Sequence, residues 1–211
     1  MKEQIEMNEE KNKYSYIFPL DENSIILDTE TTGFNDSEIC EICIIDWKGK
    51  ILLNSLVKPT LGIPKRLEEF HGITNELVAN APTFKDISSE ILEILKNKQV
   101  IIYNRKFDTD VIRSSAIHSG MDPEIFPKEQ DTLCAMNWYS ELWAQDWHPY
   151  YMNYRSQKLI NACAQQGIDI NSVQAHRAEA DCRLVLALIN EVNRKLKEGI
   201  EVKTYLVEEV K

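Results

Sequence analysis

The sequence has no apolar run that approaches the roughly 20 residues needed to cross a bilayer. Its first residues, MKEQIEMNEEKNK, contain no apolar stretch of the kind found in a secretory signal. Hydrophobic residues make up 43% and charged residues 27% of the 211 residues, which is ordinary for a globular chain. We therefore expect a cytoplasmic protein that makes no membrane contact and is not disordered.

Cysteines are few, and their number, five, is odd. Their spacing does not match a disulfide framework. Cys40 and Cys43 lie in CEIC, which could form half of a zinc site, but no second pair of Cys or His has matching spacing. Residues three apart in a strand also face opposite sides of the sheet. We predict cysteines of the protein core, in a reducing compartment.

Positive charge is also scarce, because 24 Lys and Arg stand against 34 Asp and Glu, for a formal net charge of −10. A protein that binds nucleic acid mainly by neutralising phosphates carries a basic face. The composition therefore argues against tight non-specific binding of nucleic acid. It still allows a local site at which bound cations supply the positive charge.

Alternating strand and helix patterns predict an α/β domain. Strand patterns occupy four segments, at about 24–30, 38–47, 50–59 and 99–103. Helical patterns occupy 63–74, 83–98, 104–120, 131–145, 156–168 and about 177–197. Thr83 and Asp86 predict a capping box at the start of one of these helices. Three β runs, followed by strands that alternate with helices, predict a sheet of mixed direction.

One domain accounts for most of the chain, because its length does not require a second one. We predict a partly ordered lead-in over 1–20, the main domain over 21–198 and a C-terminal tail over 199–211. The tail contains IEVKTYLVEEVK, whose alternation fits either an extra strand or a segment that binds a partner.

Two acids follow the apolar start of the first strand, in SIILDTETTGF. Asp28 and Glu30 are two residues apart, so both side chains face the same side of the sheet. Two buried like charges side by side are unfavourable. Hard divalent cations such as Mg²⁺ or Mn²⁺ bind carboxylate oxygens and would offset this repulsion.

Two further acids lie near helix starts. Asp108 falls in the first turn of the helix after strand 99–103, where the helix dipole favours an anion. Asp181 lies among apolar residues near the start of the last long helix, five residues after His176. Five helical residues would turn His176 about 140° away from Asp181, so we expect His176 on the preceding loop. From spacing alone, the acids either meet at one metal site or are capped and solvated separately.

Three segments carry a family resemblance. In order, LDTETTGF, IIYNRKFDTDVI and AHRAEADCRLV resemble the three motifs of the DEDD 3′–5′ exonuclease superfamily. The third has the pattern H-x-x-x-x-D, which resembles the DEDDh branch. The intervening ICEI, FHGIT and APTFKDISSEIL are similar to the proofreading epsilon subunit of bacterial DNA polymerase III. The resemblance spans about residues 24–190.

The resemblance implies a ribonuclease H-like α/β fold, with a five-stranded mixed sheet flanked by helices, and two divalent metal ions, Mg²⁺ or Mn²⁺. The metal ligands that it implies are the four acids, Asp28, Glu30, Asp108 and Asp181. It makes His176 the general base. The residues that it places beside the terminal nucleotide are Thr31, His71 and Phe107. For His71, packing at a helix end is an equal alternative.

The implied activity is a metal-dependent 3′–5′ exonuclease that releases nucleoside 5′-monophosphates from single-stranded or frayed DNA. The implied partner is a nucleic-acid 3′ end, DNA rather than RNA, and a polymerase or a second copy of the chain are further candidates. Two alternatives stay open. One is an RNA-trimming exoribonuclease, because the same chemistry accepts either sugar unless the 2′-hydroxyl is contacted. The other is a catalytically silent module that binds nucleic acid or a polymerase.

The aromatic segment 137–155, NWYSELWAQDWHPYYMNYR, has no counterpart among the family motifs. Together with Arg155 and Lys158, its aromatic residues fit stacking on single-stranded bases. Core packing fits them equally well.

Overall fold

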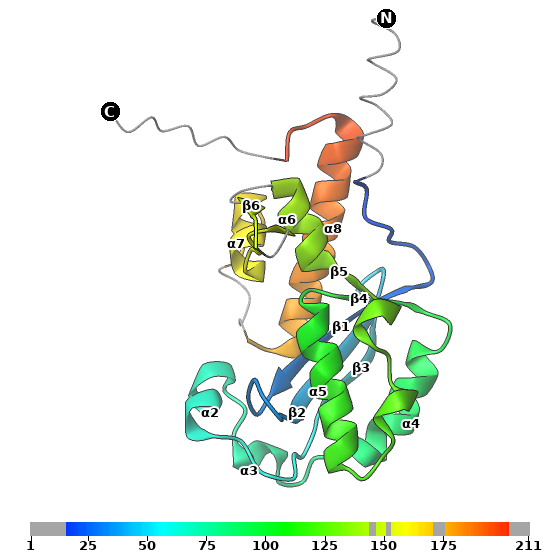
Figure 1. The fold of residues 1–211 in the computed structure, drawn as a ribbon, viewed down its shortest axis with the longest axis vertical. Coiled ribbons are helices and arrows are strands. Elements are labelled where there is room, and N and C mark those ends of the chain that lie inside the picture. The colour runs from blue at the N-terminus through cyan, green and yellow to red at the C-terminus, as the bar shows by residue number, and fades with distance from the viewer. Residues whose placement is uncertain (1–15, 144–146, 151–152, 171–175, 203–211) are drawn as a thin grey trace, which may run out of the picture.

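The computed structural model describes residues 16–143, 147–150, 153–170 and 176–202 (Figure 1). A five-stranded sheet with the order β3-β2-β1-β4-β5 forms its centre. Its strands are β1 (Ser24–Thr31), β2 (Ile39–Asp46), β3 (Ile51–Leu56), β4 (Gln99–Ile102) and β5 (Thr132–Cys134). The pairs β1–β2 and β2–β3 are antiparallel, whereas β1–β4 and β4–β5 are parallel. The predicted five-stranded mixed sheet is confirmed.

Helices cover both faces of this sheet. The face that contains Ile26 packs against α8 (Ala178–Glu198), together with α6 (Ala135–Trp143) and α7 (Leu159–Gln165). The face that contains Ile25 and Leu27 packs against α4 (Phe84–Leu95) and α5 (Arg105–His118). Because strand side chains alternate, the positions of Asp28 and Glu30 share the α8 face with Ile26.

Local signals in the sequence set several helix boundaries. The N–H of Thr83 donates to the Asp86 carboxylate at 2.8 Å, and the N–H of Asp86 donates to the Thr83 hydroxyl at 3.3 Å. This reciprocal pair confirms the predicted capping box at α4. The segment predicted as a helical connection contains α2 (Lys65–His71), which α3 (Asn75–Val78) follows.

The segment 131–145 is not the single helix that the sequence predicted. Its first residues form β5, which pairs in parallel with β4, and α6 begins only at Ala135. A three-residue strand is too short to show an alternating pattern, so pairing with β4 decides its conformation. Two 3₁₀ turns precede it, at Pro123–Ile125 and Glu129–Asp131. A separate two-stranded ribbon, β6 (Trp147–His148) and β7 (Asn153–Tyr154), was also not predicted.

All five cysteines are buried and unpaired, as predicted for core residues. Cys43 packs in the α8 layer, whereas Cys40 packs in a smaller cluster with Ile63 and Ile73. Within the part of the chain that the structure describes, no helix has the length and apolarity to cross a membrane.

Both ends of the described chain reach α8 or its neighbours. In the predicted lead-in, the N–H of Phe18 donates to Asn193 Oδ1 at 2.8 Å, and Asn193 Nδ2 donates to the Phe18 carbonyl at 2.9 Å. At the other end, Gln166 Nε2 donates to the Val202 carbonyl at 3.1 Å. The rest of the lead-in and of the predicted tail, 1–15 and 203–211, lies outside the described residues.

Candidate active site

The carboxyl half of β1 extends past the strand beside it. β1 pairs with β4 only over Ser24–Ile26, but it pairs with β2 as far as Thr31. The edge of β1 beyond Ile26 is therefore open to the start of α5, which follows β4. There Asp108 Oδ1 accepts a hydrogen bond from the N–H of Thr29 at 3.1 Å and another from the Thr29 hydroxyl at 2.7 Å. These two bonds hold the Asp108 carboxylate against β1.

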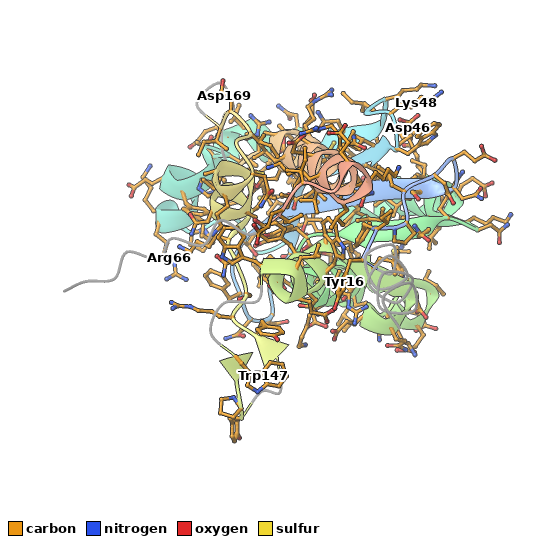
Figure 2. The ribbon with its side chains drawn as sticks, turned by 90° about the horizontal axis from the view of Figure 1, so that it is seen from above. Tyr16, Asp46, Lys48, Arg66, Trp147 and Asp169 are labelled. Carbon is orange, nitrogen blue, oxygen red and sulfur yellow. The ribbon has the colours of Figure 1, made fainter. Side chains whose placement is uncertain are left out.

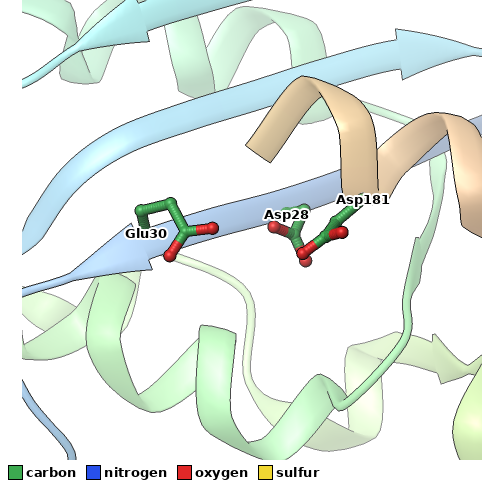
Figure 3. A group of neighbouring side chains, drawn as sticks. All are labelled: Asp28, Glu30 and Asp181. Atoms are coloured by element: carbon green, nitrogen blue, oxygen red, sulfur yellow. The ribbon is translucent and has the colours of Figure 1, made fainter. Parts of the chain in front are cut away.

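Three of the four predicted acids converge on one point. Carboxylate oxygens of Asp28, Glu30 and Asp181 all lie within 4.8 Å of one another (Figure 3). Asp28 and Glu30 come from β1, and Asp181 comes from the first turn of α8, which packs across the same face of the sheet. Asp108 lies outside this group of three but close enough for its charge to act on Asp28.

Burial and the charges of neighbouring acids raise the pKa of each of the four acids. Burial, then the charges of Asp108, Asp181 and Glu30, raise the pKa of Asp28 well above its ordinary value. Burial, then Asp181, raise the pKa of Glu30 to about 8. Burial also raises the pKa of Asp108 to about 7, although the two hydrogen bonds from Thr29 act to lower it. Burial raises the pKa of Asp181 to about 6. The cluster therefore favours either protons or another cation.

This donor set fits a hard divalent cation. Carboxylate oxygens are the ligands that Mg²⁺ and Mn²⁺ prefer, and a cation would favour the charged form of every acid in the group. The alternative in which each acid is capped or solvated separately does not describe Asp28, Glu30 and Asp181, because their oxygens share one small volume.

His176 lies on the loop directly before α8, as predicted. Its backbone has φ of 64°, in the left-handed region, which is uncommon for a residue other than glycine. Its ring packs against Phe70 of α2, with ring centroids 3.9 Å apart. Burial lowers the pKa of His176. Among the described residues, no hydrogen bond or ion pair joins His176 to the four acids.

Thr31 and His71 are both buried near the end of β1. The Thr31 hydroxyl donates to the Gly33 carbonyl at 2.8 Å. His71 Nδ1 accepts the N–H of Ile73 at 3.1 Å, and its Nε2 lies 3.8 Å from Cys40 Sγ. Burial lowers the pKa of His71, while a hydrogen bond to the Thr31 backbone acts in the opposite direction. The two residues are thus connected, and both ring nitrogens of His71 face protein atoms.

Phe107 lies in the first turn of α5, directly before Asp108, and is half-buried. Its ring faces that of Phe34, with centroids 6.0 Å apart. Phe34 is 74% exposed, although it is a large apolar side chain. Phe34 was not among the site residues predicted from the sequence. Its position four residues after Glu30, in the same motif, is the signal that could have indicated it.

A fifth acid, Glu41, lies directly opposite Glu30 in the β1–β2 register and is 2% exposed. It accepts hydrogen bonds from Arg177 Nε at 3.1 and 3.0 Å, from Arg177 Nη2, and from the N–H of Ala178 at 3.0 Å. This pair fixes the start of α8 to β2, between His176 and Asp181. Glu41 was not among the site residues predicted from the sequence, although an acid inside the apolar run of β2 is a visible signal.

Comparisons with known proteins show that the chain is similar to exonucleases. The RNase T family model, described as an exonuclease, matches residues 25–189. The chain is 40% identical over 174 residues to an uncharacterized exonuclease, CP81, of Escherichia phage 186, a match that covers 81% of this chain and 88% of the relative. It is also 35% identical over 100 residues to the DNA polymerase III subunit epsilon of Buchnera aphidicola subsp. Schizaphis graminum (strain Sg), which covers 42% of each chain.

Solved structures share the fold. One is exonuclease X in complex with 5′ overhanging duplex DNA, with a TM-score of 0.59 and 24% identity, covering 81% of this chain and 91% of the other. Another is the nuclease domain of 3′hExo, a DEDDh family member, bound to rAMP, with a TM-score of 0.59 and 16% identity, covering 84% and 92%. Because the family model matches more than half of the chain and the phage relative is 40% identical over most of both chains, the chain belongs to the RNase T exonuclease family.

Proposed function

We propose that the protein is a metal-dependent 3′–5′ exonuclease that releases nucleoside 5′-monophosphates from single-stranded or frayed DNA. The observation that carries the proposal is the convergence of Asp28, Glu30 and Asp181 within 4.8 Å, with Asp108 fixed beside them by Thr29. These four acids are the proposed ligands of two ions, Mg²⁺ or Mn²⁺. When bound, such ions lower the pKa of a water molecule and stabilise charge on the leaving 3′ oxygen.

His176 is the proposed general base. It must be neutral to take a proton from the attacking water, and burial lowers its pKa, which favours the neutral ring. In the structure the ring packs against Phe70 rather than against an acid. Catalytic contacts often tighten only when substrate is bound, so this arrangement is compatible with the role.

Other residues are proposed to position the substrate. Phe107, directly before Asp108 in the chain, and the exposed Phe34 form an aromatic pair, and aromatic rings stack on bases without strong sequence preference. Thr31 and His71 would border the terminal nucleotide by supporting the end of β1. A site that reads the backbone and the free end should discriminate little between sequences.

DNA is the proposed substrate because the exonuclease X structure contains it, although the 3′hExo structure contains rAMP. The relatives named as DNA polymerase III subunits make a polymerase a candidate partner. A catalytically silent module is the less favoured alternative, because all four acids and His176 are present.

The test uses DNA and RNA oligomers of the same sequence, labelled at the 5′ end, with Mg²⁺, Mn²⁺ or EDTA. We expect the DNA to shorten stepwise from the 3′ end, only with metal, and to yield nucleoside 5′-monophosphates. Faster shortening of the RNA would favour the exoribonuclease alternative. Cuts in a circular single strand, full activity in EDTA, or binding without hydrolysis would contradict the proposal.

A further inference from the structure

The structure divides the aromatic segment 137–155 into two parts with different surroundings. On α6, Tyr139 and Trp143 are buried in the core, at 0% and 6% exposure. On the β6–β7 ribbon, Trp147 is 50% exposed, and Tyr150, in its turn, is 83% exposed. Residues 144–146 and 151–152 lie outside the described residues. Core packing therefore explains the aromatic residues of α6 but not Trp147 and Tyr150.

The ribbon projects from the body of the protein, with Trp147 on it (Figure 2). The Trp147 ring packs edge-to-face against Tyr154 of the paired strand, with centroids 5.0 Å apart and planes at 73°. This contact restrains the indole while half of the side chain stays accessible to solvent. A restrained aromatic ring loses little conformational entropy when a flat ligand stacks on it.

The charge around the ribbon differs from that of the whole chain. Residues 147–168 contain no Asp or Glu, although the chain has 34 of them in 211 residues. The same stretch contains Arg155 and Lys158, and both are exposed. Although the whole protein has a net charge of −10, residues 147–168 present no acidic side chain that would repel a polyanion.

The base of the ribbon lies at the corner of the sheet that carries the acid cluster. The Tyr103 hydroxyl donates to the Gln157 carbonyl at 2.9 Å. Tyr103 directly follows β4 and is followed by Asn104 and α5, whose first turn carries Asp108. Tyr154 is three residues from Gln157, a distance that an extended chain spans in at most about 11 Å. A nucleic-acid strand whose 3′ end lies at the acid cluster can therefore extend to the ribbon.

We propose that the ribbon binds the single-stranded part of the substrate on the 5′ side of the scissile nucleotide. Trp147 and Tyr150 stack on its bases, and Arg155 and Lys158 lie beside its phosphates. This inference rests on the proposed function, because it takes the 3′ end of the strand to lie at the acid cluster. Its consequence is that affinity depends on oligomer length and hardly on sequence.

The test compares dT3 with dT20. Equilibrium binding is measured by fluorescence anisotropy in EDTA, and single-turnover cleavage is measured with Mg²⁺. The test variant is Trp147→Ala/Tyr150→Ala, and Trp147→Phe keeps an aromatic ring. The matched control is Trp47→Ala. Trp47 follows β2 and packs on Lys48. Lys48 lies on the opposite side of the molecule from Trp147, so this control changes a Trp far from the ribbon (Figure 2). Circular dichroism checks that each variant is folded.

We expect the double variant to bind dT20 roughly 5- to 150-fold more weakly for each base that no longer has its stacking partner. The preference for dT20 over dT3 should shrink in the same proportion, in binding and in cleavage. The Trp147→Phe variant, which keeps an aromatic ring, should retain part of the preference for dT20 over dT3, and Trp47→Ala should retain all of it. Arg155→Gln/Lys158→Gln should reduce the salt dependence of dT20 binding by about 0.7 in the log–log slope for each phosphate that is no longer neutralised.

Two results with the double variant would overturn the proposal while the proposed function stands. One is a folded double variant that keeps the wild-type preference for dT20. The other is a double variant with altered self-association in sedimentation and unchanged dT20 affinity, which would make the ribbon a contact between copies. If the wild type cleaves neither oligomer with Mg²⁺, the proposed function itself fails. If it cleaves both but shows no preference for length, only the role of the ribbon fails.

Discussion

Removal of one negative charge from the acid cluster should stabilise the metal-free protein and flatten its dependence on pH. Glu30 is the residue for this test, because it is 8% exposed and burial, then the Asp181 charge, raise its pKa from 4.5 to about 8. Between pH 4.5 and about 8, Glu30 is therefore protonated in the folded protein and ionised in the unfolded chain. Stability of the metal-free protein should fall as the pH rises through this window.

The magnitude follows from the two pKa values of Glu30. Each bound proton that differs between the folded and unfolded chain changes the free energy of unfolding by about 1.4 kcal/mol per pH unit. From pH 4.5 to about 8 the loss at Glu30 reaches roughly 5 kcal/mol as an upper limit. Asp108 and Asp181 act in the same direction, because their pKa values are also raised. Glu30→Gln should remove one such loss and stabilise the protein by a few kcal/mol at pH 8.

The assay is urea unfolding in EDTA at pH 5, 6, 7 and 8, for the wild type and Glu30→Gln. The matched control is Glu93→Gln, which removes the same charge from an exposed side chain on α4. Added Mg²⁺ should restore stability to the wild type at pH 8, by about 2.7 kcal/mol at 100 times its Kd. A Glu30→Gln protein with the wild-type slope and wild-type stability at pH 8 would refute the reasoning.

Three further predictions concern residues around the acids. Thr29→Val removes the hydroxyl donor to Asp108 and should slow cleavage roughly 10- to 100-fold. The control variant Thr109→Val, on the same helix as Asp108, should keep the wild-type rate. Equal cleavage rates for the two variants would count against the Thr29 contact. Arg177→Ala leaves the buried Glu41 carboxylate with only the Ala178 N–H as donor, and should lower the free energy of unfolding in urea by about 3 kcal/mol. Adding Glu41→Gln to this variant should recover part of that loss, and Arg183→Ala is the control. A wild-type unfolding midpoint for Arg177→Ala would contradict the prediction. His176→Ala should slow single-turnover cleavage roughly 10²- to 10⁴-fold with unchanged Mg²⁺ affinity. The wild-type rate should rise through a pKa below 6.5, because burial lowers the pKa of His176, and a variant that keeps the wild-type rate would exclude this role.

Short-range patterns determined much of this protein. The period of a strand places Asp28 and Glu30 on one face, and the structure keeps them there. The Thr83 and Asp86 pair fixes the start of α4 through bonds only three residues apart. His176 lies on the loop before α8, and α8 begins at Ala178, where the predicted helical pattern begins at about residue 177. These features depend on neighbours in the sequence, so the sequence alone predicts them.

Other features depend on groups that are far apart in the chain. The sequence does not show that Asp108 bonds to Thr29, because this contact requires β1 to extend past β4. It does not show that Glu41 lies opposite Glu30 and binds Arg177, because strand register and the docking of α8 bring them together. The strand β5 forms only because β4 offers it an edge. Tertiary packing decided these contacts, since hydrogen bonds and charge between distant residues exist only once the layers have assembled.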